Sequence, residues 1–558
     1  MSTDLLFEHF ATIATAPDGI ARLRELILQL AVQGKLGTQD AGDEPADVLL
    51  GRIRKEKDRL VKVVKIPKEK SVEYDNETLD RTFPENWIFV RLGEISDKIH
   101  YGYTASADQT NRRIRLLRIT DIQNNRVNWD LVPGCEIDDS NFLSYSINVG
   151  DLLIARTGGT VGKSFLVRDQ PVPAVFASYL IRVVPNKNLN SEYVKLFADS
   201  PTYWDQLYRM CMGTGQPNVN GMSLRSLIIP LPPLAEQHRI VAKVNRLMAI
   251  CDELEARQQY EREGCLKLGT SSLAELQNAE SPEKFEQQWA QVYDAFDLIL
   301  DCPENVAVLR QTILQMAVLG MMNTHDSKDE PVEKLMEKIR KEKVQLVKEG
   351  KSKKEKPLEP VRADEVPFVI PGPWMWCRFG DIATIETNIV PPDDFQNLPH
   401  VAPDNIEKRT GRLLHYRTVA EDDVQSPNHH FYPDHIVYSK IRPNLSKLTI
   451  VDFEGLCSAD MYPIYSHIFN KYLKIYMLSL PFYNQAVGDE NRLAMPKINQ
   501  TQLNLIYVAV PPLAEQHRIV AKVDSLMALC DALESRLKER AGVQGRLAGA
   551  VVKQVAGG

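Results

Sequence analysis

The sequence lacks several features that would place it in a familiar class. Its eight cysteines are scattered without a Cys-x-x-Cys pair, which argues against a structural zinc site or a disulfide framework, so we expect core thiols. No run of 18 apolar residues occurs, and the N-terminal residues lack the basic start of a secretory signal. We therefore expect a cytoplasmic protein with no membrane partner.

Signatures of catalysis are also missing. No Gly-x-Gly-x-x-Gly dinucleotide motif is present. The segment RTGGTVGKS at residues 156–164 looks like a phosphate loop, but Thr157 stands where a Walker loop needs its first glycine. His429, His430 and His435 match no metal-ligand spacing and are expected on the surface. We expect no catalytic residue, no metal site and no cofactor bound by this chain.

The composition is that of an ordinary globular protein with several domains. The 558 residues allow about three to five domains. With 44% hydrophobic and 25% charged residues, fibrous and wholly disordered classes are excluded. A net charge of −7 argues against bulk electrostatic capture of nucleic acid, so such a role would need local basic patches or partner proteins.

The chain contains an internal repeat. The run PPLAEQHRIVAKV at residues 232–244 recurs unchanged at residues 511–523, and 21 of 26 positions agree when the match is continued through Arg257 and Arg536. Further matches precede it, among them IRKEK at residues 53–57 and 339–343, and Trp87 with Trp374. Between these matches the two halves diverge almost completely. Two similar frames thus hold two unlike inserts.

The frames are predicted to be helical. After each Pro-Pro pair, apolar residues recur at steps of three and four, which places them on one helix face. The two stripes are Ile240, Val244, Leu247, Cys251 and Leu254, and Ile519, Val523, Leu526, Cys530 and Leu533. We expect the two helices to pack against each other, antiparallel about a pseudo-twofold axis; the alternative is that each packs on its own neighbouring domain. Glu236, Gln237, Glu515 and Gln516 are expected to satisfy first-turn amides.

The inserts are predicted to be mixed α/β. Short β-rich runs occur at residues 151–155, 180–184 and 435–439, and helices are expected at residues 191–210 and 470–480. The Lys- and Glu-rich stretches at residues 62–70 and 348–359 are typical of solvated linkers.

These residues resemble a known family. The chain is similar over essentially its full length to the specificity subunit of type I restriction-modification systems, in which two target recognition domains alternate with two conserved helical regions. The most specific marker is the run Pro-Pro-Leu-Ala-Glu-Gln-His-Arg-Ile-Val that follows each insert. Secondary markers are GDLLIARTGGTVGK at residues 150–163 and DHIVYSKIRPNLSK at residues 434–447.

The resemblance implies an α+β fold: two mixed α/β target recognition domains joined by two long antiparallel helices in a coiled coil with internal pseudo-twofold symmetry. The expected boundaries are residues 1–83 (helical region and linker), 84–230 (first recognition domain), 231–370 (central helical region and linker), 371–510 (second recognition domain) and 511–558 (final helix). A helix from about residue 236 to 263 would span about 40 Å, close to the roughly 34 Å of one DNA turn.

The resemblance also implies partners. Each insert would read one half of a bipartite, asymmetric double-stranded DNA target, and the frames would bind two methyltransferase subunits, through which restriction subunits join. S-adenosylmethionine, ATP and Mg²⁺ would belong to those partners. The [ND]PP[YF] motif of such methyltransferases is absent here. The alternative hypothesis is a duplicated protein-binding scaffold without DNA recognition.

Basic and polar residues of the inserts are the candidate DNA contacts, because arginine suits guanine edges and asparagine suits adenine. The candidates are Arg112, Arg113, Arg115 and Arg118; Arg156, Thr157, Thr160 and Lys163; and Lys440, Arg442, Asn444 and Lys447. A solvated hairpin at the glycine-rich segment, a solvated arginine face and a simple turn role for Asn444 remain the alternatives. The inserts carry 15 basic against 14 acidic residues and 12 against 15, so tight binding would depend on partners.

Overall fold

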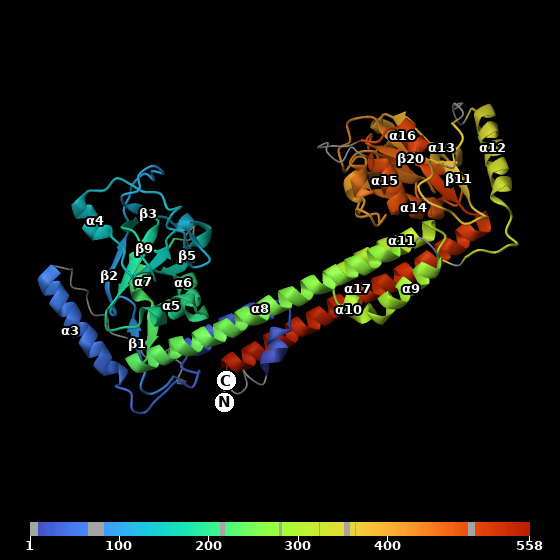
Figure 1. The fold of residues 1–558 in the computed structure, drawn as a ribbon. Helices are drawn as coiled ribbons and strands as arrows, with labels where there is room; N and C mark the ends of the chain where they lie inside the picture. The colour runs from blue at the N-terminus through green and yellow to red at the C-terminus, as the bar shows by residue number, and fades with distance from the viewer. Residues whose placement is uncertain are drawn as a thin grey trace. The chain divides into compact units, whose positions relative to one another are not determined.

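The computed structural model describes residues 9–64, 83–211, 218–277, 282–322, 324–350, 358–362, 364–488 and 497–557. It confirms the α+β class, with two mixed α/β domains alternating with helical segments (Figure 1). The chain divides into two compact units, residues 1–259 with 539–558 and residues 260–538. Most of the two predicted linkers falls outside the described residues.

The first unit combines the first recognition domain with helices on either side of it in the sequence. Its helices are α2 (Gly19–Val32), α3 (Ala46–Val64), α4 (Asp139–Tyr145), α5 (Ser191–Asp199), α6 (Pro201–Cys211), α7 (Gly221–Ser226) and the first part of α8 (Leu234–Gln277). Its strands are β1 (Ile88–Arg91), β2 (Ser96–Tyr101), β3 (Arg115–Leu117), β4 (Ile122–Gln123), β5 (Arg126–Val127), β6 (Leu152–Ala155), β7 (Ser164–Leu166), β8 (Ala174–Phe176), β9 (Leu180–Pro185) and β10 (Ile228–Leu231).

The second unit repeats this plan. Its helices are α9 (Pro282–Asp294), α10 (Phe296–Leu300), α11 (Pro303–Val318), α12 (Val332–Lys348), α13 (Phe379–Ile382), α14 (Asn470–Leu478), α15 (Leu480–Val487), α16 (Gln500–Leu505) and most of α17 (Leu513–Gly557). Its strands are β11 (Met375–Arg378), β12 (Ala383–Ile385), β13 (Ile389–Val390), β14 (Pro399–Val401), β15 (Arg417–Thr418), β16 (Asn428–Phe431), β17 (Ile436–Ser439), β18 (Leu448–Ile450), β19 (Gly455–Cys457), β20 (Met461–Ser466) and β21 (Tyr507–Val510). Figure 1 shows α14 alongside the sheet that contains β20.

The predicted strands are present as β6, β9 and β17, but both predicted insert helices are interrupted. The first ends at Asp199, and α6 starts afresh at Pro201; the second ends at Leu478, and Pro481 lies in the first turn of α15. Proline has no N–H to continue a helix, which explains both interruptions. Among the described residues no helix is both long enough and apolar enough to cross a membrane.

Each recognition domain begins and ends on one two-stranded sheet. β1 pairs antiparallel with β10, and β11 pairs antiparallel with β21. The long helix starts three residues after the closing strand in each copy, with α8 at Leu234 and α17 at Leu513. The start of each long helix is thereby fixed to both ends of its domain.

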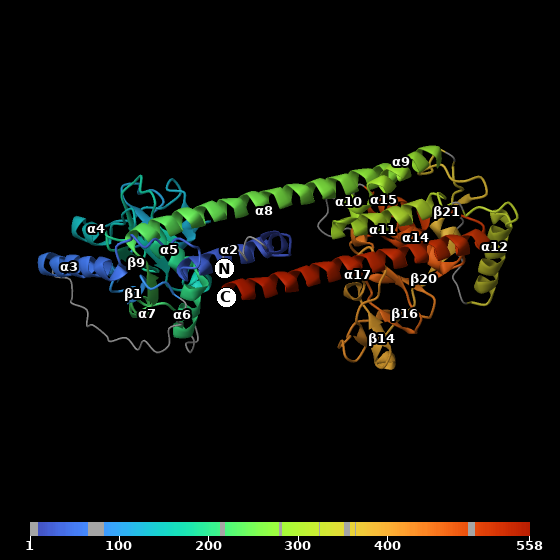
Figure 2. The ribbon, with the colours of Figure 1, turned by 90° about the horizontal axis from the view of Figure 1, so that it is seen from below.

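The first long helix exceeds the predicted length, and the second spans nearly all of the predicted final segment. α8 has 44 residues and α17 has 45, and each is continuous in Figure 2. Their final turns are assigned to the other unit: residues 260–277 belong to the second unit and residues 539–557 to the first. Val551 and Val555 of α17 accordingly lie in the same core cluster as Ile20 of α2.

The predicted apolar stripes are buried, each within its own unit. Ile240, Val244, Leu247 and Cys251 belong to one core cluster, with Leu254 packed against it. Ile519, Val523 and Cys530 belong to a different cluster, with Leu526 and Leu533 packed against that one. The described contacts of the stripes lie within each unit, where α2 belongs to the first cluster and α11 to the second.

An arginine in each short frame helix joins it to the long helix. Arg24 of α2 pairs with Asp252 at 2.6 Å and Glu255 at 2.8 Å. Arg310 of α11 makes the same pair of contacts with Asp531 and Glu534. These carboxylates belong to the repeated run, so its charged residues have the same partners in both copies.

Hydrogen bonds to the buried Glu236 hold the start of α8 against the first recognition domain and the segment before it, and we call this arrangement the latch. The fully buried Glu236 carboxylate accepts hydrogen bonds from Trp87 Nε1 at 2.8 Å, Thr38 Oγ1 at 3.0 Å and Gln39 Nε2 at 2.9 Å. Gln237, also fully buried, accepts from Asn190 N and donates to Pro232 O, each at 3.0 Å. The expectation that these side chains cap first-turn amides was wrong, because they hold the domain instead.

The second copy repeats the latch. Glu515 accepts from Trp374 Nε1 at 3.1 Å and Thr324 Oγ1 at 2.9 Å, and His325 Nδ1 lies 2.6 Å away. The neighbouring arginine of each run also has equivalent partners: Arg239 bonds Asp43, and Arg518 bonds Asp329. The identity of the two runs therefore reflects one set of contacts made twice.

The histidines expected on the surface of the second domain are buried. His429, His430 and His435 are 3%, 6% and 4% exposed. Burial lowers the pKa of His435 to about 4, since desolvation disfavours the charged ring. His430 Nε2 lies 2.8 Å from Glu454. No group of three potential metal ligands gathers among the described residues.

We predict that Glu515→Ala destabilises the protein by roughly 2–4 kcal/mol, because it leaves the buried Trp374 and Thr324 donors without an acceptor. Thermal denaturation measures the change. Glu534→Ala is the matched control, since that carboxylate is 37% exposed and its loss should cost less than about 1 kcal/mol. Equal shifts for the two variants would contradict the latch.

We predict that acidification destabilises the second unit. Between pH 6.5 and about 4 the unfolded chain protonates His435 while the folded protein keeps it neutral, so its contribution, fully present above pH 6.5, is lost as the pH falls. The loss between pH 7 and 5 is on the order of 1 kcal/mol. His435→Gln should flatten this pH dependence, measured by denaturant unfolding, whereas exposed His415→Gln should not. Parallel curves for both variants would refute the assignment.

Candidate nucleic-acid interface

The two recognition domains contain equivalent four-stranded sheets. The strand order is β2-β9-β6-β7 in the first domain and β12-β20-β17-β18 in the second, with antiparallel pairing throughout. The glycine-rich segment joins β6 to β7, and the Lys-Ile-Arg-Pro segment joins β17 to β18. We call residues 156–163 the first tip and residues 440–447 the second tip.

The tips match residue by residue. Ala155 N donates to Lys163 O at 2.9 Å, and Ser439 N donates to Lys447 O at the same distance. Each tip contains one short 3-10 turn, at Gly158–Thr160 and at Pro443–Leu445. Arg156 is therefore equivalent to Lys440, and Lys163 to Lys447. The weak sequence similarity of these segments conceals one backbone design.

Two positions in each tip have left-handed backbone. In the first tip they are Gly158 and Gly162, both with φ of 81°. In the second tip they are Arg442, with φ of 48°, and Ser446, with φ of 45°. Glycine adopts this conformation freely, whereas other residues lose roughly 1–2 kcal/mol. Because the chain turns at Arg442, a strand-like alternation that would place Lys440 and Arg442 on one side does not apply here.

The first tip presents a mixture of stacked and exposed side chains. The Arg156 guanidinium carbon lies 4.8 Å from the centre of the Tyr101 ring. Lys163 is exposed, and with Thr160 it lines a hollow of about 340 Å³. Thr157 is half-buried and bridges in backbone to Asn218. The tip thus combines the exposed Lys163, the half-buried Arg156 and two exposed glycines.

The second tip divides into contacting and exposed residues. Lys447 Nζ donates to Pro403 O at 2.7 Å and Asp404 Oδ1 at 3.1 Å, and its contact with DNA stays a prediction. Lys440 Nζ lies 5.3 Å from the centre of the Tyr462 ring. Arg442 is exposed. Among the residues that the structure describes, no hydrogen bond or ion pair engages its guanidinium.

Asn444 is half-buried in the second tip. Its Oδ1 is buried and has no hydrogen-bond partner among the described residues. The residue lies inside the 3-10 turn, in agreement with the predicted turn role. Because its amide oxygen is buried, the predicted contact of Asn444 with DNA stays a prediction.

The arginine cluster of the first domain is mostly structural. Arg115 is 7% exposed and donates to Val132 O at 2.8 Å, which excludes it from a surface contact. Arg118 pairs with Asp121 at 2.8 Å, and this hydrogen bond raises the arginine pKa. Arg112 donates to Asp130 O at 2.6 Å. Arg113 is exposed, and its contact with DNA stays a prediction.

Arg409 is not among the DNA contacts predicted from the sequence. Its backbone N donates to Leu445 O of the second tip at 3.1 Å, and its side chain lines a hollow beside Ser446. The sequence signal that could have indicated it is the basic run Lys408-Arg409-Thr410-Gly411-Arg412. In the structure this run turns, with left-handed backbone at Arg409 and Gly411. That run is separated from the tip by about 30 residues of sequence, so only the fold shows the connection.

Comparison with known proteins agrees with this architecture. The family model described as the type I restriction modification DNA specificity domain matches residues 84–262 and 371–541. The specificity subunit of the Escherichia coli type I restriction enzyme EcoEI is 31% identical, covering 96% of this chain and 93% of that protein. The EcoAI specificity subunit, also from Escherichia coli, is 30% identical over the same shares.

A solved structure of the HsdS subunit from Thermoanaerobacter tengcongensis superimposes with a TM-score of 0.41 and 19% identity, covering 85% of this chain and 97% of that one. The family model covers both recognition domains and the first part of each long helix. The relatives are named as specificity subunits, in agreement with a non-catalytic role. This chain belongs to the family of type I restriction-modification specificity subunits.

Proposed function

We propose that each recognition domain reads one half of a bipartite, asymmetric DNA target through its tip. The observation that carries the proposal is the equivalence of the tips: one backbone design presents Arg156, two glycines and Lys163 in one domain, and Lys440 and Arg442 in the other. Unlike residues on a shared scaffold can read unlike half-targets. The protein-scaffold alternative has no observation in its favour.

We further propose that the helical frames dock two methyltransferase subunits, through which restriction subunits join in the cytoplasm. The two frames repeat the same sequence and the same latch, so they offer one type of partner two equivalent surfaces. S-adenosylmethionine, ATP and Mg²⁺ are then used by those partners. The near-neutral charge of the inserts supports dependence on partner subunits for affinity.

The direct test is a gel-shift assay of the chain with its methyltransferase subunit on random duplexes at low salt. Binding is expected.

We predict that the double variant Lys440→Ala, Arg442→Ala changes which sites are methylated while the complex still assembles, because the charges lie at the tip and not in a core. Lys328→Ala, Lys471→Ala is the matched control, since both lysines are exposed.

No shift for any duplex would overturn DNA recognition altogether. Unchanged methylation of every site in the tip variant, judged by methylome sequencing of cells that express the whole system, would refute the role of the second tip. Loss of assembly, measured by size-exclusion chromatography, would show that the two residues support the fold instead.

The helices are proposed to set the unread spacer. We predict that seven extra residues inserted into both α8, after Gln259, and α17, after Lys538, lengthen the spacer by about three base pairs, since a heptad adds about 10.5 Å of helix. Both helices must be extended because each ends in the other unit. Methylome sequencing measures the spacer; the parental spacing in the double insertion would rule the idea out.

A further inference from the structure

Left-handed backbone at unfavourable residue types is concentrated at one place. Eight non-glycine residues in the described ranges have positive φ, and five of them are asparagine or aspartate, which tolerate it. The other three are Arg409, Arg442 and Ser446. Arg442 and Ser446 lie in the second tip, and Arg409 is hydrogen-bonded to Leu445 of that tip. Strain gathered at one site is characteristic of functional sites.

The first tip shows that the backbone does not need these side chains. Gly158 and Gly162 hold the positions of Arg442 and Ser446 with the same turn and the same closing hydrogen bond. The Arg442 side chain is exposed and unengaged by the described residues, so packing within them does not offset its strain. The fold therefore does not require an arginine at position 442.

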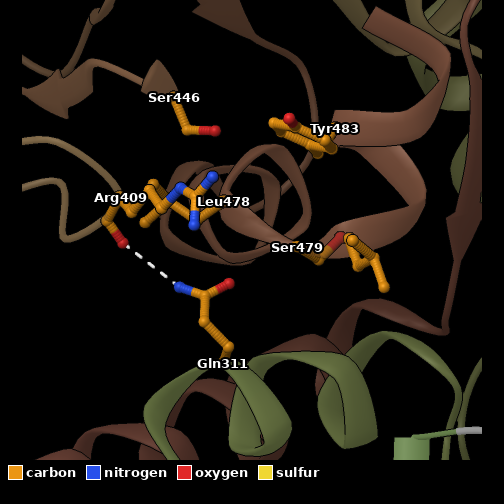
Figure 3. Close-up of a pocket in the computed structure, with 7 residues that line it drawn as sticks. Gln311, Arg409, Ser446, Leu478, Ser479 and Tyr483 are labelled. Atoms are coloured by element: carbon orange, nitrogen blue, oxygen red, sulfur yellow. Dashed lines mark hydrogen bonds between the residues drawn. The ribbon is translucent and has the colours of Figure 1, made fainter. Parts of the chain in front are cut away.

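Arg409 and Ser446 line a hollow of about 160 Å³ behind the tip (Figure 3). The Arg409 guanidinium carbon lies 5.7 Å from the centre of the Tyr483 ring, and Gln311 Nε2 of α11 donates to Arg409 O at 3.4 Å. In Figure 3 the Ser446 hydroxyl points toward the Tyr483 side of the hollow. A cavity of roughly this size holds a small molecule such as benzene, so a single compact group fits.

Arg409 is the one charged residue among those that line the hollow. Its lining residues are Gln311, Arg409, Ser446, Leu478, Ser479, Leu480 and Tyr483, none of which is acidic. In the described part of the chain no carboxylate pairs with Arg409, whereas nearby Arg412 is neutralised by Glu407 at 2.8 Å. In the first domain Trp204 and Leu207 stand against Gly162, within 3 Å of where a Cβ would lie. The hollow of the first tip, lined by Thr160 and Lys163, thus has a different lining from the hollow of the second tip.

We propose that this hollow takes a phosphate of the DNA backbone, held by the Arg409 guanidinium and the Ser446 hydroxyl, and that Arg442 reads a guanine edge beside it. This inference rests on the proposed DNA recognition and deepens it. Phosphate contacts fix register, and base contacts carry sequence information. Arginine is suited to both, as a charge against phosphate and as a bidentate donor to guanine O6 and N7. The shared backbone hydrogen bond between Arg409 and Leu445 would couple the two contacts.

The test compares Arg409→Gly with Arg442→Gly, each bound to the methyltransferase subunit. Both substitutions relieve left-handed strain, so both variants should melt at or above the wild-type temperature. Arg409→Gly should weaken binding to target and unrelated duplexes by the same factor, about tenfold, and reduce the slope of log K against log salt by about 1. Arg442→Gly should weaken target binding alone and relax the requirement at one guanine position.

Arg412→Ala is the matched control, because it removes a charge from the same segment that Glu407 already neutralises. Its salt slope should equal that of the wild type. Arg409→Lys, which keeps the charge, should retain the slope and serves if the glycine variant folds poorly. An Arg409→Gly slope equal to that of Arg412→Ala overturns the phosphate site, and a lower melting temperature overturns the assignment of strain.

Inorganic phosphate distinguishes a free anion from the DNA backbone. If phosphate at constant ionic strength raises the melting temperature of the wild type but not of Arg409→Gly, while the DNA salt slopes agree, the hollow binds free anion and the DNA assignment is overturned. If the wild-type complex binds no duplex at all, the failure lies with the proposed function and not with this site.

Discussion

The organisation of this protein depends on a buried carboxylate at the start of each long helix. Glu236 and Glu515 are fully buried and accept hydrogen bonds from the tryptophans that open the recognition domains. A buried charge is tolerated only when its hydrogen-bonding capacity is satisfied, so domain, N-terminal segment and helix must meet in one arrangement. That requirement explains why the run around each glutamate is identical while the inserts differ. Each recognition domain therefore has a defined orientation relative to the start of its long helix.

The two tips show how one backbone scaffold accommodates different residues. The first tip meets its two left-handed positions with glycine, and the second meets them with arginine and serine at a cost in stability. In the first domain Trp204 and Leu207 stand against Gly162 and a hollow is lined by Thr160 and Lys163, whereas the hollow of the second domain is lined by Arg409 and Ser446. The first tip thus has residues that adopt its backbone freely, and the second has side chains at the same positions instead.

Polar and charged residues account for most of the errors of sequence interpretation. Arg115 and Lys447 looked like surface cations, yet each donates to backbone carbonyls within its own domain. His435 looked exposed and lies in the core. The local sequence around such residues does not distinguish a solvated side chain from one whose partner comes from elsewhere in the chain, because the partner is distant in sequence: Pro403 precedes Lys447 by 44 positions.

The sequence by itself determined the duplication, the amphipathic stripes on both long helices, the first strand of each hairpin that carries a tip and the family. Each of these depends on local periodicity or on direct identity between the two halves, and such patterns survive without knowledge of the fold. Only the tertiary structure decided which surfaces bury the stripes, where the helices end, which cations remain exposed and how Arg409 joins the second tip. Those outcomes depend on contacts between residues far apart in the chain, where burial and hydrogen-bond satisfaction decide the free energy and local pattern carries no information about the partner.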